Sequence, residues 1–270
     1  KNRFNFQNIK FSEIAKIKDN TNDLRAIIFD LGYSTNQIKD LTRGLSFQSK
    51  GKLNMQMGLN FVSANEVINK LEEKELTKIF KVFGEENSGK IISKKINYLR
   101  KNKNIQTEDL VKIINSVKKK KYSKIHNATK VFQSLRIIVN NEISELIYGL
   151  INSFKILPIG GIIVVITFHS IEDKIVKFFF KNYSESKKVS RYLPLKDEKK
   201  NLFKLINKKP ILPGKEELKL NPASRSAKLR YGIKINNNND FSEFLNKFNY
   251  LLEIESLYKK IWKRFFSHFW

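Results

Sequence analysis

Two short apolar runs have the pattern of buried parallel strands. The first covers residues 25–32 and ends in Asp-Leu-Gly, and the second covers residues 162–167 and is rich in Ile and Val. Short apolar runs bounded by turn residues are typical of strands whose two faces are both covered. Less regular runs at residues 203–206 and 227–235 predict two further strands, joined through a proline-containing loop.

Apolar residues recur at helical spacing between and around these strands. Ser63 and Glu66 have the spacing of a capping box, and the helical pattern that follows them continues to Gly84. The widest apolar stripe, at residues 129–153, predicts one long helix laid on a sheet. The other helices are predicted at residues 88–101, after Thr107, from 170 to about 182, and within 241–270.

The order strand, long helix, strand, helix is the pattern of an α/β domain with parallel strands. We expect this domain to comprise residues 1–38 and 128–236, with residues 39–127 inserted as a helical domain. Residues 237–270 are expected to form a linker and a C-terminal helical tail. The aromatic side chains of this tail favour packing on the core over contact with a membrane surface.

The composition is that of a globular protein with a strongly basic surface. Hydrophobic residues make up 41% of the 270 residues, which argues against disorder, and the formal net charge is +26. Such a charge promotes binding to nucleic acids through the release of counterions. However, Arg supplies only nine of the 52 basic residues, so the excess of Lys also fits an AT-rich coding bias spread over all surfaces.

The sequence lacks the residues that several kinds of chemistry require. It contains no Cys, and its three His residues have no metal-ligand spacing, so we expect no metal and no thiol nucleophile. Residues 147–168 are the longest apolar stretch, but Lys155, Pro158 and Gly160 interrupt it before it reaches the length of a membrane span. We expect a soluble, cytoplasmic protein with no membrane partner.

Polar residues follow both predicted parallel strands, at the edge where open sheets bind ligands. Asp30 closes the first strand and suits either a hydrogen-bond acceptor in a site or the N-cap of the next helix. His169 follows the second strand and suits either a general base or a histidine that holds the turn. The basic and hydroxyl residues at 221–230 fit phosphate contacts and a solvated loop about equally well. The sequence has no Gly-rich phosphate or cofactor loop.

Six segments between residues 4 and 235 together form a specific combination. They are Phe29–Ser34 with Gln37, Arg43–Gln48, Leu53–Met57, Lys130–Arg136, Phe168–Asp173, and Asn221–Pro222 with Ser224–Arg230. In this order they resemble the MraW/RsmH family of S-adenosylmethionine-dependent methyltransferases. Members of that family modify the N4 amine of a cytosine in the decoding region of 16S ribosomal RNA.

The resemblance implies a class I, Rossmann-like methyltransferase sheet with an inserted helical domain that recognises the substrate. It implies S-adenosylmethionine as cofactor, contacted by Phe11, Asp30 and Gln37, and Asp30 is also our candidate catalytic residue. The family's first strand, its glycine-rich cofactor loop and its ribose-binding acid have no counterpart in this sequence. We therefore expect the N-terminal part of the sheet to be missing.

The resemblance also implies a ribosomal RNA substrate. The basic residues expected to contact this RNA are Arg43, Lys118, Lys119, Lys120, Lys121, Arg225, Lys228 and Arg230. The expected partners are 16S ribosomal RNA within the small ribosomal subunit and, in a homodimer, a second copy of the chain. Because methylation at cytosine C5 normally uses a thiolate, a sequence without Cys excludes that chemistry and leaves N4 open. The alternative is a non-catalytic RNA-binding remnant that has lost half of its cofactor pocket.

Overall fold

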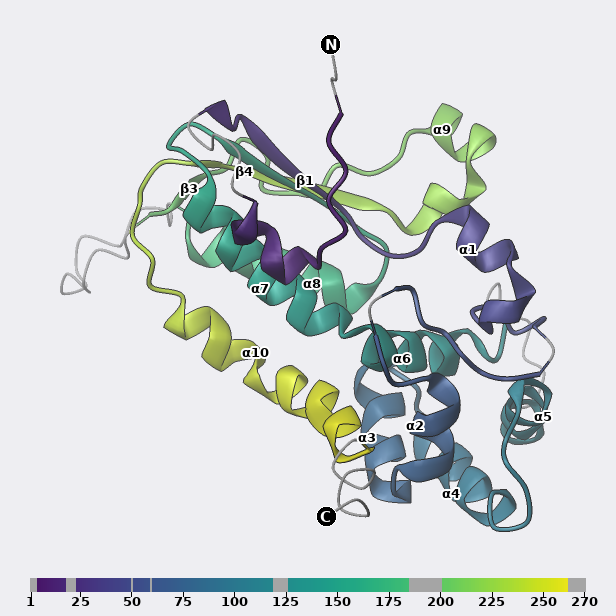
Figure 1. Ribbon diagram of the computed structural model, residues 1–270. Helices are drawn as coiled ribbons and strands as arrows, with labels where there is room; N and C mark the ends of the chain where they lie inside the picture. The colour runs from purple at the N-terminus through teal and green to yellow at the C-terminus, as the bar shows by residue number, and fades with distance from the viewer. Residues whose placement is uncertain are drawn as a thin grey trace, which may run out of the picture. The chain divides into compact units, whose positions relative to one another are not determined.

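The computed structural model describes residues 4–17, 23–49, 51–58, 60–118, 126–184 and 201–261 (Figure 1). The chain divides into two compact units. We call the first the sheet unit; it comprises Lys1–Gly32 and Glu145–Phe248. The second, the helical unit, comprises Tyr33–Ser144 and Asn249–Trp270.

The two compact units do not coincide with the expected domains. Residues 33–38 and 128–144, which we expected in the α/β domain, cluster with the helical unit, and residues 237–248 cluster with the sheet unit. Compactness alone assigns no function to either unit. The division into a methyltransferase domain, a substrate-recognition insertion and a tail therefore stays a prediction.

The sheet unit is built on four strands in the order β1-β2-β4-β3. They are β1 (Ala26–Asp30), β2 (Ile162–Thr167), β3 (Phe203–Lys204) and β4 (Lys228–Lys234). Strands β1 and β2 run parallel, and β4 is antiparallel to both β2 and β3. The strands lie where the apolar runs predict them, although β3 is shorter than expected. This mixed sheet confirms the expected α/β class and is consistent with a Rossmann-like methyltransferase fold.

One face of the sheet is covered by α7 (Glu142–Ile156) and α8 (Ser170–Asn182), which lie along it in Figure 1. Phe29 of β1 is buried on this face, whereas Ile28 on the opposite face is 67% exposed. The expectation that both faces of β1 are buried is therefore wrong. Residues of β1 alternate between buried and exposed positions, because the described residues leave the face that carries Ile28 open to solvent.

Shorter helical elements and one further helix complete the sheet unit. They are η1 (Phe11–Lys16), α9 (Lys215–Leu220), η4 (Pro222–Ser226) and, as far as Phe248, α10 (Ser242–Glu255), whose remaining residues belong to the helical unit. Aromatic rings join α8, β3 and the beginning of α10. The ring of Phe179 lies 5.3 Å from that of Phe203 and 5.0 Å from that of Phe244, measured between centroids. Such tilted pairs bury large apolar areas and hold these elements together.

A buried lysine closes the C-terminal end of α7. The Nζ atom of Lys234 donates hydrogen bonds to the carbonyl oxygens of Phe154 and Leu157, at 2.7 Å each. It also lies 4.3 Å from the centroid of the Phe154 ring. Burial lowers the pKa of Lys234, but the helix end offers carbonyl groups that carry partial negative charge. These bonds tie the last residue of β4 to α7.

The helical unit consists mainly of short helices. They are α1 (Thr35–Lys39), η3 (Leu41–Arg43), α2 (Ala64–Lys70), α3 (Glu73–Val82), α4 (Gly89–Leu99), α5 (Thr107–Val117), α6 (Thr129–Asn140) and η5 (Ser256–Tyr258). Helices α4 and α5 lie where the sequence predicts them. In the described part of the chain, no helix has both the length and the apolar character needed to cross a bilayer.

Two predicted helices are each divided into two. The pattern that begins at Ser63 breaks at Leu71, whose backbone is extended, so α2 and α3 are separate. The stripe over residues 129–153 breaks at Asn141, whose φ of 54° is left-handed, so α6 and α7 are separate. Asn is among the few residue types that tolerate this conformation. Apolar spacing continues across both breaks, which is why the pattern alone does not locate them.

Gly84 follows α3 because the backbone of α6 comes very close at this point. A Cβ atom on Gly84 would lie 2.5 Å from the carbonyl oxygen of Lys130 and 2.7 Å from that of Phe80. Neither backbone atom is able to move aside as a flexible side chain would. The glycine thus permits the packing of α3 against α6.

A buried carboxylate caps the N-terminus of α7 within the helical unit. The Oε atoms of Glu255 accept hydrogen bonds from the backbone N–H groups of Ile143 and Ser144, at 2.8 and 2.9 Å. Burial raises the pKa of Glu255 to about 7; the hydrogen bonds from Ser144 and Ile143 oppose this shift, and nearby Glu142 adds to it. The ordinary pKa of this carboxyl group is 4.5. At pH values between 4.5 and about 7, the folded state therefore holds a proton on Glu255 that the unfolded state has released.

The free energy of unfolding should consequently fall as the pH rises from about 4.5 to about 7. The largest effect that this pKa shift allows is about 3 kcal/mol. Glu255→Gln cannot ionise and should lose this part of the pH dependence, while other titrating groups contribute equally to both proteins. Urea unfolding of wild type and variant at about pH 5 and about pH 8 measures the difference. Identical pH dependence in the two proteins would contradict the assignment.

Candidate functional site

The carboxyl ends of β1 and β2 lie side by side in the sheet unit. Asp30 is paired in register with Ile166, and the backbone N–H of Leu31 donates to the carbonyl oxygen of Ile166 at 3.2 Å. The chain then turns at Gly32, whose φ is 97°. The Asp30 side chain is exposed at this edge. The two strand ends that the sequence singled out are therefore neighbours, as the parallel pairing requires.

His169 holds the turn between β2 and α8. It is the N-cap of α8, and its Nδ1 accepts from the backbone N–H of Glu172 at 3.5 Å. Its Nε2 lies 3.1 Å from Oε1 of Glu172, and both side chains are buried. The other carboxylate oxygen of Glu172 accepts from the backbone N–H groups of Phe168 and His169, at 2.8 and 3.2 Å. The sequence left two interpretations of His169, a general base and a residue that holds the turn. This geometry favours the second interpretation.

Phe11 is positioned on β1 by the helix α7. Its ring meets that of Phe29 edge to face, with centroids 5.5 Å apart, and it remains 45% exposed. A Cβ atom on Gly149 of α7 would lie 3.2 Å from atoms of both rings, so the absence of a side chain there lets η1 sit close to α7. The backbone N–H of Ser12 donates to Glu145 at 3.0 Å and secures η1 on α7.

Gln37 lies in the helical unit, where it belongs to a capping box at the start of α1. Its Oε1 accepts from the backbone N–H of Ser34 at 2.9 Å, and the Oγ of Ser34 accepts from the backbone N–H of Gln37 at 3.2 Å. The Oε1 atom of the amide is thus engaged, and among the described residues its NH₂ group has no hydrogen-bond partner. Phe11 and Asp30 belong to the sheet unit and Gln37 to the helical unit.

Asn140 joins two of the motif segments within the helical unit, and the sequence did not single it out. Its Oδ1 accepts from the backbone N–H of Met57 at 2.8 Å and from Nδ2 of Asn60 at 3.1 Å. Its Nδ2 donates to the carbonyl oxygens of Met55 and Arg136, at 2.8 and 2.9 Å. All four hydrogen-bonding positions of this buried amide are used. Asn140 therefore attaches the segment around Met55 to α6.

Asn140→Ala should destabilise the helical unit by about 3 kcal/mol, because it leaves buried backbone groups without partners. The matched control is Asn102→Ala, which removes an exposed amide in a turn and should change stability by less than about 0.5 kcal/mol. Urea unfolding compares the two variants with the wild type. Equal stability of both variants would show that the buried network contributes nothing.

Two residues expected to contact RNA are held by one carboxylate of the sheet unit. Lys228 Nζ lies 2.9 Å from Oδ2 of Asp173, and Arg230 Nε lies 2.8 Å from Oδ1. Burial acts to raise the pKa of Asp173, but the hydrogen bonds from Arg230 and Lys228 outweigh it and lower the pKa below its ordinary value. The triad carries a net positive charge. Sequence spacing shows that Lys228 and Arg230 share one face of a strand, but it does not reveal their acidic partner on α8.

The remaining basic residues expected to contact RNA differ in their surroundings. Arg43 forms an ion pair with Asp40 at 3.1 Å. Lys118 donates to Glu86 at 2.7 Å and to the carbonyl oxygen of Asn127 at 2.9 Å. Arg225, in η4, is exposed. Lys119, Lys120 and Lys121 lie outside the described residues.

Polar residues at the adjacent carboxyl ends of two parallel strands mark the edge where open α/β sheets bind ligands, and this arrangement is consistent with a Rossmann-like methyltransferase fold. Comparison with known families agrees with this class. The model of the MraW methylase family matches residues 1–235. The chain belongs to the MraW methylase family.

Curated relatives of the chain bear the name ribosomal RNA small subunit methyltransferase H. The protein from Agrobacterium fabrum is 41% identical over 227 residues, which cover 83% of this chain and 66% of the relative. The protein from Rhizobium meliloti is 40% identical with the same coverage. The protein from Bartonella tribocorum is 40% identical over 237 residues, which cover 87% of this chain and 70% of the relative. The chain thus spans about two thirds of the length of the relatives it matches.

Proposed function

We propose that the chain takes part in the transfer of a methyl group from S-adenosylmethionine to the N4 amine of a cytosine in the decoding region of 16S ribosomal RNA. The match to the MraW methylase family over residues 1–235 is the observation that carries this proposal. The relatives' name gives the substrate class, ribosomal RNA of the small subunit. The substrate would be the small ribosomal subunit in the cytoplasm, and a homodimer remains an expected form of the enzyme.

The chemical groups at the end of β1 are of the types that could contact S-adenosylmethionine. Phe11 offers an exposed aromatic surface on one face of the strand, and Asp30 offers a carboxylate at its tip. Successive side chains of a strand point to opposite faces, so a ligand laid across the end of β1 can contact both residues. Gln37, which belongs to the helical unit, is proposed as a further cofactor contact on the strength of the family match alone. Bound there, the cofactor would supply a methyl group on a positively charged sulfur.

Asp30 suits the task of orienting the cytosine amine. That amine is a poor nucleophile because its lone pair is delocalised into the ring. A carboxylate that accepts one of the two N–H hydrogens can hold the nitrogen with its lone pair directed at the methyl group. The exposed side chain of Asp30 at the strand end is accessible to a base in this way. Contact with the cofactor is a second role that its position allows.

The RNA would be held by basic residues of both units. Arg225, Lys228 and Arg230 belong to the sheet unit, and Arg43 and Lys118 belong to the helical unit. The target cytosine has to leave its stack to reach an active site, so the enzyme must grip the backbone on either side of it. The helical insertion at 39–127 is proposed as the element that recognises the RNA.

Asp30→Ala should lower the rate of methyl transfer by about a hundredfold or more, because a positioned acceptor contributes on that order. RNA binding should change little. Glu216→Ala removes an equally exposed carboxylate from α9 and serves as the control for the loss of one negative charge. Single-turnover rates with labelled cofactor measure the effect, and an unchanged rate for Asp30→Ala would remove Asp30 from the active site.

The proposed function is tested with small ribosomal subunits that lack the modification. The chain is incubated with labelled S-adenosylmethionine, and the RNA is digested and analysed by nucleoside mass spectrometry. N4-methylcytidine is the expected product. RNA binding without any affinity for the cofactor would instead support the non-catalytic RNA-binding alternative.

A further inference from the structure

Helices α3 and α4 form an antiparallel hairpin within the helical unit (Figure 1). Near one end of the pair, a Cβ atom on Gly89 would lie 3.3 Å from Cγ of Lys81. Near the other end, Nδ2 of Asn97 donates to Oε2 of Glu73 at 3.4 Å. The start of α4 thus meets the end of α3, and the end of α4 meets the start of α3.

The two helices turn their apolar sides to one core. Fully buried residues recur on each helix at a spacing of three or four, so they occupy one side of it. They include Leu76, Ile79 and Phe80 of α3 and Ile92 and Ile96 of α4. Because the helices lie side by side, their opposite sides together form one outer face.

This outer face is lined by exposed lysines, and we call it the lysine face. Its members are Lys74, Lys78 and Lys81 of α3 and Lys90 and Lys94 of α4. Their spacing of three or four residues places the lysines of each helix in one row. At a rise of about 1.5 Å per residue, the row on α3 is about 10 Å long. The row on α4 begins beside it, since Lys90 follows the glycine that meets Lys81.

The described residues supply no acidic partner for the lysine face. None of its five lysines forms an ion pair with a described residue. Glu73 accepts from Asn97, Glu75 is buried and paired with Lys260, and α4 contains no acidic residue. Lysines three or four residues apart on one helix repel each other and weaken the helix. A bound polyanion would relieve this repulsion.

An exposed aromatic ring accompanies the lysines on α4. Tyr98 is 72% exposed and follows Lys94 by four residues, so it lies one turn further along the same side of the helix. A ring beside a row of cations is the platform on which unpaired bases stack. Inorganic phosphate would have no use for this ring.

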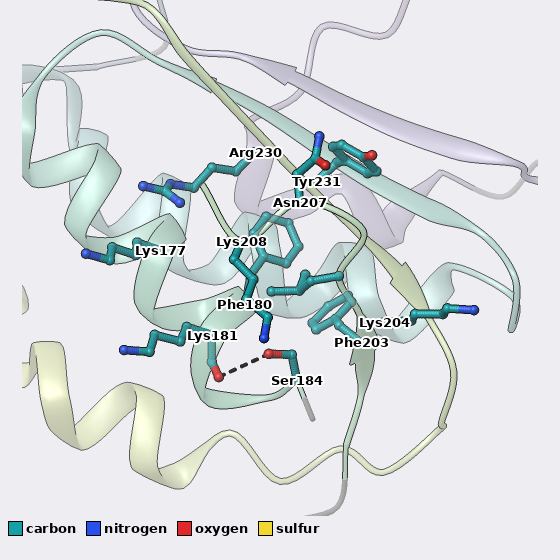
Figure 2. Close-up of a pocket in the computed structure, with 11 residues that line it drawn as sticks. Lys177, Phe180, Lys181, Ser184, Phe203, Lys204, Asn207, Lys208, Arg230 and Tyr231 are labelled. Atoms are coloured by element: carbon teal, nitrogen blue, oxygen red, sulfur yellow. Dashed lines mark hydrogen bonds between the residues drawn. The ribbon is translucent and has the colours of Figure 1, made fainter. Parts of the chain in front are cut away.

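The lysines of the sheet unit are arranged differently. A cavity of about 670 Å³ lies beside β3 and β4, and Figure 2 shows lysines among the residues that line it. Lys177 and Lys181 belong to α8, which covers one face of the sheet. Lys204 pairs with Ile233 and therefore lies on the opposite face. These lysines do not form one surface, so the gathering on α3 and α4 is not a general feature of the chain.

We propose that the lysine face and Tyr98 bind single-stranded RNA, with the lysines on its phosphates and Tyr98 stacked on a base. The inference rests on the proposed function, because it takes the RNA substrate as the source of the strand. It assigns this contact to residues other than the basic residues singled out in the sequence. An enzyme that must hold a nucleotide out of its stack gains affinity from contacts to the flanking strand.

The first test uses fluorescence anisotropy with a labelled oligouridine of about 12 nucleotides, a length within the range bound by single-strand sites. Lys78→Ala/Lys94→Ala should raise Kd roughly tenfold at about 0.15 M salt and reduce the slope of log K against log salt by about 1.4. Lys78→Arg/Lys94→Arg keeps both charges and should bind within about twofold of the wild type.

The control Lys155→Ala/Lys247→Ala removes two exposed lysines from helices of the sheet unit. Its Kd should stay within about twofold of the wild type. Thermal unfolding verifies that each variant is folded. Equal effects of the lysine-face and control variants would overturn the proposal. Vesicles of phosphatidylserine that bind as tightly as the RNA, with the same dependence on Lys78 and Lys94, would also overturn it.

The second test concerns the ring. Tyr98→Ala should raise Kd at least about fivefold, whereas Tyr98→Phe, which keeps the ring, should bind like the wild type. The control Tyr250→Ala removes a ring that is 53% exposed on α10 and should leave Kd unchanged. In the wild type, ultraviolet cross-linking to a thiouridine-containing strand should modify the peptide that contains Tyr98. An unchanged Kd for Tyr98→Ala, or cross-links only to other peptides, would contradict the assignment.

The outcome is separable from that of the proposed function. Oligonucleotide binding needs neither cofactor nor methyl transfer, so weaker binding by the lysine-face variants supports the RNA site even if no methylated product forms. Conversely, N4-methylcytidine formed at the wild-type rate by Lys78→Ala/Lys94→Ala, together with unchanged binding, would remove the lysine face and leave the proposed reaction in place.

Discussion

The parallel pairing of β1 with β2 is the interaction on which the candidate site depends. The two strands are far apart in the sequence, yet their register places Asp30 beside Ile166 and brings the turns that follow both strands to one edge. The other contacts at that edge form on strands that this pairing has already placed side by side. His169 and Glu172 complete the turn after β2, and the aromatic contact between Phe11 and Phe29 attaches η1 to the buried face of β1. A slip in register would separate the strand ends and reverse the faces of their side chains.

Buried charges in this protein are held at helix ends and in ion pairs. Lys234 faces the terminal carbonyl groups of α7, and Glu255 faces the first N–H groups of the same helix, so each charge meets the complementary end of the helix dipole. Asp173 instead receives two cations from β4. In each case the partners compensate for part of the cost of removing the charge from water. The raised pKa of Glu255 shows that this compensation is incomplete there.

The sequence predicts the strands well because their apolar runs are bounded by turn residues. It predicts helix positions but not helix breaks, since Leu71 and Asn141 interrupt patterns whose apolar spacing continues on both sides. The open face of β1 was also missed, because an apolar residue such as Ile28 carries no mark of its exposure. The role of Asn140 and the pairing of Asp173 with β4 were missed for a different reason. Their partners are remote in sequence, so only the folded chain shows what they bind.

The net positive charge of the protein has two explanations, a nucleic-acid partner and a coding bias. The positions of the basic residues help to distinguish them. Lys118, Lys228 and Arg230 are engaged by carboxylates within their own unit, as expected of residues that serve the fold. Exposed lysines of the sheet unit are instead spread over both faces of the sheet, since Lys177 and Lys181 project from α8 and Lys204 projects from the opposite face. A coding bias that replaces Arg by Lys acts over the whole surface in this way. A single strand of RNA requires cations and aromatic rings gathered on one face, and net charge alone does not supply that.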